Sequence, residues 1–344
     1  MTTDSWHGSL EPDLDYMLPE RPDPEFRESA SIWLYDDEGE FGFPRIGIEA
    51  KGSTWENHGF QMNYVSRDGR AIVDGGPGTS HSPFDSTGKP SILGTNGLVF
   101  QCIEPFRKWR VTYEGQPVDT TSEAMIGKTM DPSRRTGLKL DVELTMAAPG
   151  WVQDLRPEKL VGLTPQQYTD AGLMGYGWRV EQLFRAEGEV TIDGQSRSFR
   201  GTGNRIHRQS ERPLDAFRGH SWQAALFPDG RGFAFCTYPP REDGTTYNDA
   251  YLYQDGKVYA AVVKGKPPFL RNLTPRGDDL SFELESELGT TRIEGTSEFN
   301  VFHLLVPEMP GFHLHQGGAK YVWDGQTAYG QVERSDRFEN VTGG

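Results

Sequence analysis

Short segments of alternating apolar and polar residues, separated by tight-turn sequences, run through most of this chain. The clearest is Leu138 to Met146, in which every second residue is apolar and the residues between are polar. This period of two places one set of side chains on each face of a β-strand. Asp-Gly pairs, which favour the two-residue turn of a hairpin, adjoin such segments at residues 68–69, 193–194, 229–230, 255–256 and 324–325. The pattern predicts an all-β protein of antiparallel strands.

Many short strands are expected to close into barrels, because closure removes the exposed strand edges that promote aggregation. The chain of 344 residues is long enough for two such units. The strand pattern lapses between Trp151 and Gly175, where Thr164 and Pro165 predict the start of a short helix that ends at Gly172. We therefore predict two barrel-like antiparallel β domains joined by this linker helix. The predicted parts are an extended N-terminal arm (1–29), a first domain (30–175) and a second domain (176–344).

The charge of the chain limits its partners. A formal net charge of −15 argues against nucleic acid, whose phosphates it would repel. No apolar run approaches the roughly 20 residues that span a bilayer, so no integral membrane association is expected. The acidic N-terminus lacks a basic segment followed by an apolar one, which predicts a cytoplasmic protein without a secretory signal. The sequence leaves a homodimer open.

Several common cofactor motifs are absent from the sequence. It contains no phosphate-binding loop, no dinucleotide fingerprint after a strand, no GxSxG elbow and no CxxC pair. Cys102 and Cys236 lie in apolar strand contexts, which is typical of buried structural thiols. The absence of these motifs excludes most cofactor-dependent functions.

The segment from Gly201 to Tyr238 concentrates ionisable groups in a predicted strand pair. Polar residues flank His207 on both faces of the predicted strand, and Arg205 and Glu211 lie on the same face as His207. Neighbouring charges and burial can move the pKa of an imidazole across neutrality, so this group could hold a general acid or base. A network of ion pairs without catalysis explains the same residues equally well.

The second half of this segment has a different character. His220 and Trp222 share a face with Ala224 and Leu226, which fits either a core histidine or the wall of a small-molecule pocket with one polar group. The candidate catalytic residues are His220, His207, Glu211 and Arg205. The candidate substrate-binding residues are Trp222, Trp178, Tyr176, Trp109, Trp55, Gln223 and Tyr329. His303, in the apolar run VFHLLV, is expected to be a core histidine rather than a ligand.

Several stretches resemble a known superfamily. They are the GxGxRxH segment (Gly201 to His207), GHSW (Gly219 to Trp222), Gln316 to Ser335, Glu104 to Gly115, and Leu138 to Pro149. Together they resemble the lipocalin-like superfamily of AttH proteins, carotenoid 1,2-hydratases (hydroxyneurosporene synthases) and fungal Diels–Alderase relatives, in a two-domain branch. Many members carry RDHSWG in one piece, whereas here Ile206 stands in place of the aspartate and the two halves are separated.

The resemblance implies two lipocalin-like antiparallel β-barrels packed side by side, a ligand cavity within or between them, and no metal or organic cofactor. It also implies acid/base chemistry on hydrophobic substrates. The leading hypothesis is a cofactor-independent lyase, hydratase or isomerase that acts on an apolar terpenoid or aromatic small molecule. The alternative is a binding or carrier protein for the same kind of ligand, and a third reading is a carbohydrate-active β protein.

Overall fold

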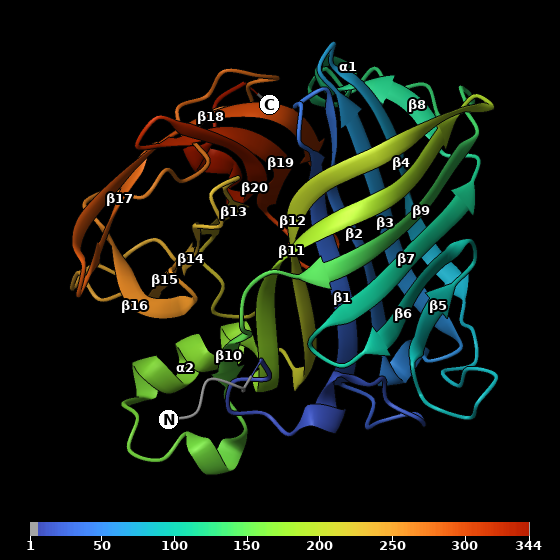
Figure 1. Cartoon of the computed structure of the whole chain (residues 1–344). Coiled ribbons are helices and arrows are strands. Elements are labelled where there is room, and N and C mark those ends of the chain that lie inside the picture. Colours follow the sequence, from blue (N-terminus) through green and yellow to red (C-terminus); the bar gives the residue numbers. More distant parts are fainter. Residues whose placement is uncertain (1–5, 344) are drawn as a thin grey trace.

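A computed structural model describes residues 6–343 and consists almost entirely of antiparallel strands in two sheets (Figure 1). Both sheets curl, and they pack side by side, which confirms the predicted all-β fold of two lipocalin-like units. Within this described part of the chain, no helix has the length and apolar character needed to cross a membrane.

The first sheet contains twelve strands. Eleven of them form one path, in the spatial order β5 (Ile92–Thr95), β6 (Leu98–Glu104), β7 (Lys108–Gly115), β9 (Leu138–Met146), β11 (Tyr176–Ile192), β12 (Gln195–Glu211), β1 (Phe26–Asp36), β2 (Phe41–Lys51), β3 (Asn57–Ser66), β4 (Arg70–Thr79) and β8 (Val118–Thr121). The short β10 (Trp151–Asp154) pairs with β11 outside this path. An isolated bridge between Ser80 and Thr95 joins the end of β4 to β5, so the sheet curls back onto itself as a barrel.

The second sheet is a closed barrel of eight strands. Its strands are β13 (His220–Leu226), β14 (Gly232–Thr237), β15 (Asn248–Gln254), β16 (Lys257–Lys264), β17 (Phe282–Ser286), β18 (Gly289–His303), β19 (Phe312–Trp323) and β20 (Gln326–Arg337). Each strand pairs with the next in sequence, and β20 closes the barrel on β13.

The predicted domain boundary at residue 176 is wrong for the sheet pairing. The long strands β11 and β12 pair with each other, and they join β9 to β1 within the first barrel. The second barrel therefore begins at His220. Alternation reveals which way the side chains of a strand point but not which strand it pairs with, so the residues after 176 could not be assigned to a barrel by pattern alone.

The predicted linker helix is present as α2 (Pro165–Met174). Thr164 caps it in a reciprocal capping box with Gln167, as its position before Pro165 indicated. The helix continues past Gly172 and ends before Gly175, whose φ of 119° is a conformation that glycine adopts easily. The remaining short elements are α1 (Ser122–Ile126) and the 3-10 turns η1 (Pro12–Asp15), η2 (Gly52–Thr54), η3 (Pro157–Lys159) and η4 (Phe338–Asn340).

An apolar cluster with residues from both sheets packs between the two barrels. Trp33 of β1 and Trp222 of β13 meet edge to face with their ring centroids 4.7 Å apart, and Tyr35 of β1 donates a hydrogen bond of 2.6 Å to the carbonyl of Gly317 in β19. Aromatic contacts of this kind add to the free energy gained from burial. The barrels therefore share a packed interface.

One irregularity in β2 bears on the functional site. Trp33 of β1 lies opposite two residues of β2, Pro44 and Arg45, so β2 contains a β-bulge with one extra residue. Arg45 adopts a φ of 78°, which is unusual for a residue other than glycine. The bulge also reverses the side-chain parity of the strand, since the core-facing residues are Phe41 and Phe43 before it and Ile46, Ile48 and Ala50 after it.

Candidate functional site

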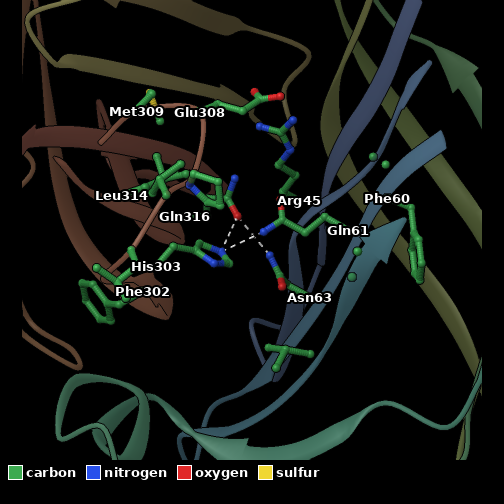
Figure 2. Close-up of a pocket in the computed structure, with 18 of the residues that line it drawn as sticks. Arg45, Phe60, Gln61, Asn63, Phe302, His303, Glu308, Met309, Leu314 and Gln316 are labelled. Carbon is green, nitrogen blue, oxygen red and sulfur yellow. Dashed lines mark hydrogen bonds between the residues drawn. The ribbon is translucent and has the colours of Figure 1, made fainter. Parts of the chain in front are cut away.

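A cavity of about 820 Å³ lies between the two barrels (Figure 2). β2 and β3 supply its wall on the side of the first barrel, and β18, β19 and β20 supply much of the opposite wall. The rim loop (residues 304–311), which joins β18 to β19, lines the mouth. Cavities of this size suit a small organic ligand.

Apolar side chains form most of the cavity wall. They are Phe60, Val73, Val118, Met125, Met130, Leu214, Phe217, Phe302, Leu304, Leu305, Val306, Pro307, Met309 and Leu314. Leu305 in the rim loop is 82% exposed, so an apolar side chain stands in solvent at the entrance. The wall therefore matches a largely apolar ligand.

Glu333 of β20 organises the polar side of the cavity. Its Oε1 lies 3.2 Å from Nε2 of His220, its Oε2 accepts a hydrogen bond of 3.0 Å from the amide of Gln316, and Arg45 lies 3.5 Å from that same oxygen. Burial raises the pKa of Glu333, but the hydrogen bond from His220 and the charge of Arg45 outweigh it and lower the pKa to about 2. Glu333 is thus an anion held between the two barrels.

The bulge in β2 brings Arg45 to this anion. Arg45 also lies 3.6 Å from Glu49 of its own strand, and the amide of Asn63 donates a hydrogen bond of 2.9 Å to the Pro44 carbonyl, which stabilises the bulge. Burial raises the pKa of Glu49, but nearby arginines, chiefly Arg208, lower it to about 2. In a regular strand without the extra residue, the side chain at this position would point to the opposite face of the sheet.

A chain of hydrogen bonds connects Glu333 to a histidine in the cavity. Because Gln316 donates its amide N–H to Glu333, its Oε1 faces Asn63 at 3.1 Å and Nε2 of His303 at 2.9 Å (Figure 2). An acceptor oxygen at that position requires a proton on Nε2 of His303. The amide nitrogen of Gln61 lies 2.7 Å from the same nitrogen of His303. Two N–H groups would repel each other there, so the Nε2–H tautomer also requires the Gln61 amide to be reversed, with its oxygen toward His303.

His303 is therefore held in one tautomer with its other nitrogen free. Burial and the charge of Arg45 lower its pKa despite the hydrogen bond to Gln316, so the ring is neutral near neutral pH. Nδ1 has no hydrogen-bond partner among residues 6–343, and His303 lines the cavity. A neutral imidazole with an unshared electron pair toward a ligand space is suited to act as a general base. The sequence pattern instead predicted a core histidine here.

A smaller inner pocket, of about 40 Å³, adjoins the main cavity, because Arg45, Arg212, His220 and Glu333 line both. Of the residues predicted from the sequence, His220 and Trp222 lie here. Nδ1 of His220 contacts the Ser335 hydroxyl at 2.7 Å, so both of its ring nitrogens are engaged by protein groups.

The structure places His207 away from the cavity, inside the first barrel. Its Nδ1 lies 3.1 Å from Asp15 of the N-terminal arm and its Nε2 lies 3.0 Å from Glu28 of β1. The rings of Trp109 and Trp178 stand edge-on to it at 5.3 and 4.9 Å. Burial lowers the pKa of His207, but the two carboxylates outweigh burial and raise it, so this histidine is a buried imidazolium.

Arg205 belongs to the same buried network. Its guanidinium binds both oxygens of Asp15 at 2.8 and 2.9 Å, and Nε1 of Trp109 donates to Asp15 at 3.0 Å. Burial raises the pKa of Asp15, but Arg205 and His207 outweigh it and lower the pKa to about 2. Four of the predicted residues therefore lie together around Asp15 of the arm, namely Arg205, His207, Trp109 and Trp178. This group lies apart from His220.

The other predicted residues lie apart from the cavity. Gln223 accepts a hydrogen bond of 2.7 Å from Tyr321 inside the second barrel, and the ring of Tyr176 lies tilted against that of Tyr168 in α2, with their centroids 4.9 Å apart. Tyr329 lies on β20 within 3.4 Å of Arg67, Trp55 stands 5.3 Å from His58, and Glu211 is the exposed last residue of β12. None of these five lines the cavity or the inner pocket.

Sequence reasoning missed Arg45, Gln316, Glu333 and the role of His303. Arg45 had a detectable signal, since the apolar parity of β2 changes from odd to even across Pro44. The others lie on three different strands of the second barrel, and only its closure brings them together. Among residues 6–343, no group of three or more His, Cys, Asp or Glu side chains is arranged to hold a metal ion.

A closed barrel packed on a second curled sheet, with a ligand-sized cavity between them, defines a lipocalin-like double-barrel protein. Residues 12–337 match the domain of unknown function DUF7064, and the chain belongs to that family. The matched region runs from the arm to the last strand of the second barrel. A comparison with curated proteins gave no match.

Two solved structures share this fold over nearly the whole chain. An AttH-like protein from Nitrosomonas europaea superposes with a TM-score of 0.59 at 14% identity, over 91% of this chain and 92% of that one. Kievitone hydratase from Nectria haematococca superposes with a TM-score of 0.54 at 9% identity, over 96% of this chain and 94% of that one. The resemblance to the AttH and hydratase superfamily is thus confirmed at the level of the fold.

Proposed function

We propose that this protein is a hydratase-type lyase that adds water to, or removes it from, an apolar aromatic or terpenoid small molecule by acid/base chemistry of its own side chains. The observation that carries the proposal is His303, a neutral imidazole that lines an 820 Å³ cavity and whose Nδ1 forms no hydrogen bond with residues 6–343. The Gln316–Glu333 hydrogen-bond chain fixes its tautomer. No metal or organic cofactor takes part in the proposed reaction.

The proposed reaction uses His303 twice. In the direction of addition, Nδ1 takes a proton from a water molecule while the water oxygen bonds to one carbon of a polarised double bond. The imidazolium then returns a proton to the neighbouring carbon. The sum is one water added across the double bond with the histidine restored, and dehydration is the reverse. Nε2 keeps its proton throughout, because Gln316 accepts from it.

Two further features support a substrate of this kind. The apolar wall suits a hydrophobic ring system, while Arg45, Gln61 and Asn63 offer hydrogen bonds at one side. A protein of the same fold is named as a hydratase of kievitone, which supports the reaction class by analogy of fold. By the same analogy we place the DUF7064 family as a branch of the superfamily that includes the carotenoid 1,2-hydratases.

His220 takes a positioning role in this proposal. Its Nε2 holds Glu333, and Glu333 in turn orients Gln316 and hence His303. Loss of His220 would act on the proton transfer through this chain rather than by direct contact with substrate. His207 and Arg205, which the sequence favoured as catalytic, serve here to bind the arm to the first barrel.

The test is incubation of the protein with hydrophobic extracts in water labelled with heavy oxygen, followed by mass spectrometry. A product that gains one labelled water would identify both substrate and reaction. His303→Gln should then lower turnover by about 10²- to 10⁴-fold, the usual contribution of one placed acid or base. His313→Gln is the matched control, because His313 is a buried histidine of β19 that does not line the cavity.

A cavity that binds a ligand without reaction is the alternative. Compounds recovered from the protein unchanged, with no label gained in any extract, would favour a carrier and refute the hydratase. Equal turnover of the His303→Gln and wild-type proteins would refute the assignment of the base. A cytoplasmic location and a homodimer remain predictions.

A further inference from the structure

The outer face of β12 carries an arginine that the proposed reaction does not use. Alternate residues of this strand point into the first barrel, as His207 does, and the residues between them point toward the second barrel. Arg208 is one of this second set and lines the inner pocket beside His220 and Glu333. Its backbone pairs with Ser29 of β1 on one side and Arg179 of β11 on the other.

Arg208 is buried without a protein partner. Its residue surface is 7% exposed, and within residues 6–343 its side chain has no hydrogen bond and no ion pair. The Nε atom is sealed from solvent with its hydrogen unsatisfied. A guanidinium keeps its charge in proteins, and an unpaired buried charge costs several kcal/mol. The Arg208 guanidinium is therefore present in the fold despite its unfavourable free energy of burial.

The inner pocket as a whole has more positive than negative charge. Four arginines line it, and Glu333 is the one carboxylate among its lining residues. Arg179 forms an ion pair with Glu181 at 2.5 Å, and Arg45 forms ion pairs with Glu333 and Glu49. Arg212 donates to the Leu173 carbonyl at 2.7 Å and forms no ion pair with a described residue.

Arg208 and Arg212 are therefore the two arginines of the inner pocket that form no ion pair with a described residue. Burial, and next the charge of Arg212, lower the pKa of Arg208 well below its usual value. Glu49 attracts Arg208 electrostatically but forms no ion pair with it. A negative charge placed between the two guanidinium groups would satisfy both.

We infer that the inner pocket is an anion site, in which Arg208 and Arg212 bind the carboxylate of a ligand whose apolar body fills the main cavity. The pocket volume of about 40 Å³ leaves room for one small polar group, since a water molecule takes up roughly 30 Å³. The inference rests on the proposed function only in taking the main cavity as the ligand site. Under this inference the substrate is an amphipathic acid. A free inorganic anion bound in the inner pocket is the other possible source of the negative charge.

The first measurement is thermal unfolding of Arg208→Met, with Arg179→Met as the matched control. The two arginines are cross-strand neighbours and line the same pocket, but only Arg179 has a protein counter-ion. Removing Arg208 should lower the midpoint clearly less than removing Arg179, because Arg208 loses only the longer-range attraction of Glu49 while an apolar group replaces a buried charge that has no ion pair. Removing Arg179 should lower the midpoint, because Glu181 then stays buried without its partner.

The second measurement is binding of a matched pair of probes, 2-naphthoate and its neutral amide, by calorimetry. The wild type should bind the carboxylate about 10- to 100-fold more tightly than the amide, as expected for a charge-assisted hydrogen bond. Arg208→Met should remove this preference while it still binds the amide. Sodium chloride that stabilises the wild type but not Arg208→Met, with no preference between the probes, would assign the site to a free inorganic anion.

The inference falls if Arg208→Met is destabilised as much as Arg179→Met, because Arg208 would then have a structural role. It also falls if neither naphthoate nor chloride distinguishes the wild type from Arg208→Met. Both measurements are independent of turnover. An Arg208-dependent anion site in a protein without hydratase activity would leave this inference standing and refute the proposed function.

Discussion

Replacing Asp15 by asparagine should destabilise the whole first barrel. Asp15 lies in the N-terminal arm, yet its carboxylate is fully buried and accepts hydrogen bonds from Arg205, His207 and Trp109 and from the backbone N–H of Phe106. Asparagine keeps the shape of this side chain but removes its charge. The amide also turns an N–H toward donors that previously met an oxygen.

The size of the effect follows from the charges left behind. Without Asp15, the imidazolium of His207 keeps the Glu28 carboxylate at 3.0 Å, but Arg205 keeps only a hydrogen bond to the uncharged amide oxygen of Gln182. Breaking a buried ion pair from one side costs about 3–5 kcal/mol. The pKa of Asp15 gives a second, smaller value for the same loss of stability. Its fall from 3.8 to about 2 corresponds to about 2 kcal/mol, at roughly 1.36 kcal/mol per pKa unit.

The assay is urea unfolding followed by circular dichroism, with Asp13→Asn as the control. Asp13 lies two residues away in the same turn and is exposed, so its substitution should change the free energy of unfolding by less than about 0.5 kcal/mol. Adding Arg205→Met to Asp15→Asn should recover part of the loss, because the orphaned charge is then removed. A loss below about 1 kcal/mol for Asp15→Asn would refute the view that the arm is part of the barrel core.

Two further predictions concern ionisation. Asp15, Glu49 and Glu333 have pKa values lowered to about 2 in the folded protein, from ordinary values of 3.8 for Asp15 and 4.5 for the two glutamates. Their stabilisation is therefore complete above about pH 5 and is lost as the pH falls from there through about 2. Acid titration by circular dichroism should show unfolding in this window, and full stability at pH 2 would contradict it. Burial raises the pKa of the Cys102 thiol, and it raises that of the Cys236 thiol to about 12. Neither thiol should therefore react with Ellman's reagent at pH 8 until denaturant is added. Rapid reaction in the folded protein would show that these strands open.

Local patterns predicted the elements better than their assembly. The alternation of Leu138 to Met146 appears as β9 with every second residue buried, and Thr164 caps the helix that it predicted. The start of the second barrel was misplaced because β11 alternates in the same way whichever sheet it joins. Hydrogen-bond partners between distant strands leave no local signature in one sequence.

The same limit explains what was found of the site. His220 and Trp222 could be selected because their polar and aromatic groups interrupt a small apolar face within one strand. Glu333 and Gln316 could not, since each looks like an ordinary polar residue until the barrel closes. The charge around His207 predicted either a tuned acid or base or a network of ion pairs at the surface. The structure instead has a buried network, because the arm supplies the counter-ion Asp15 and covers these residues.

The bulge in β2 suggests how such a site can arise. The strand keeps its pairing on both sides of Pro44 and Arg45, so a single inserted codon is enough to add this feature without redesign of the barrel. Its effect is to give an internal core strand one cationic group directed outward at the neighbouring barrel. Comparison of family members with and without this extra residue would separate those able to hold the Glu333 anion from those that keep only the scaffold.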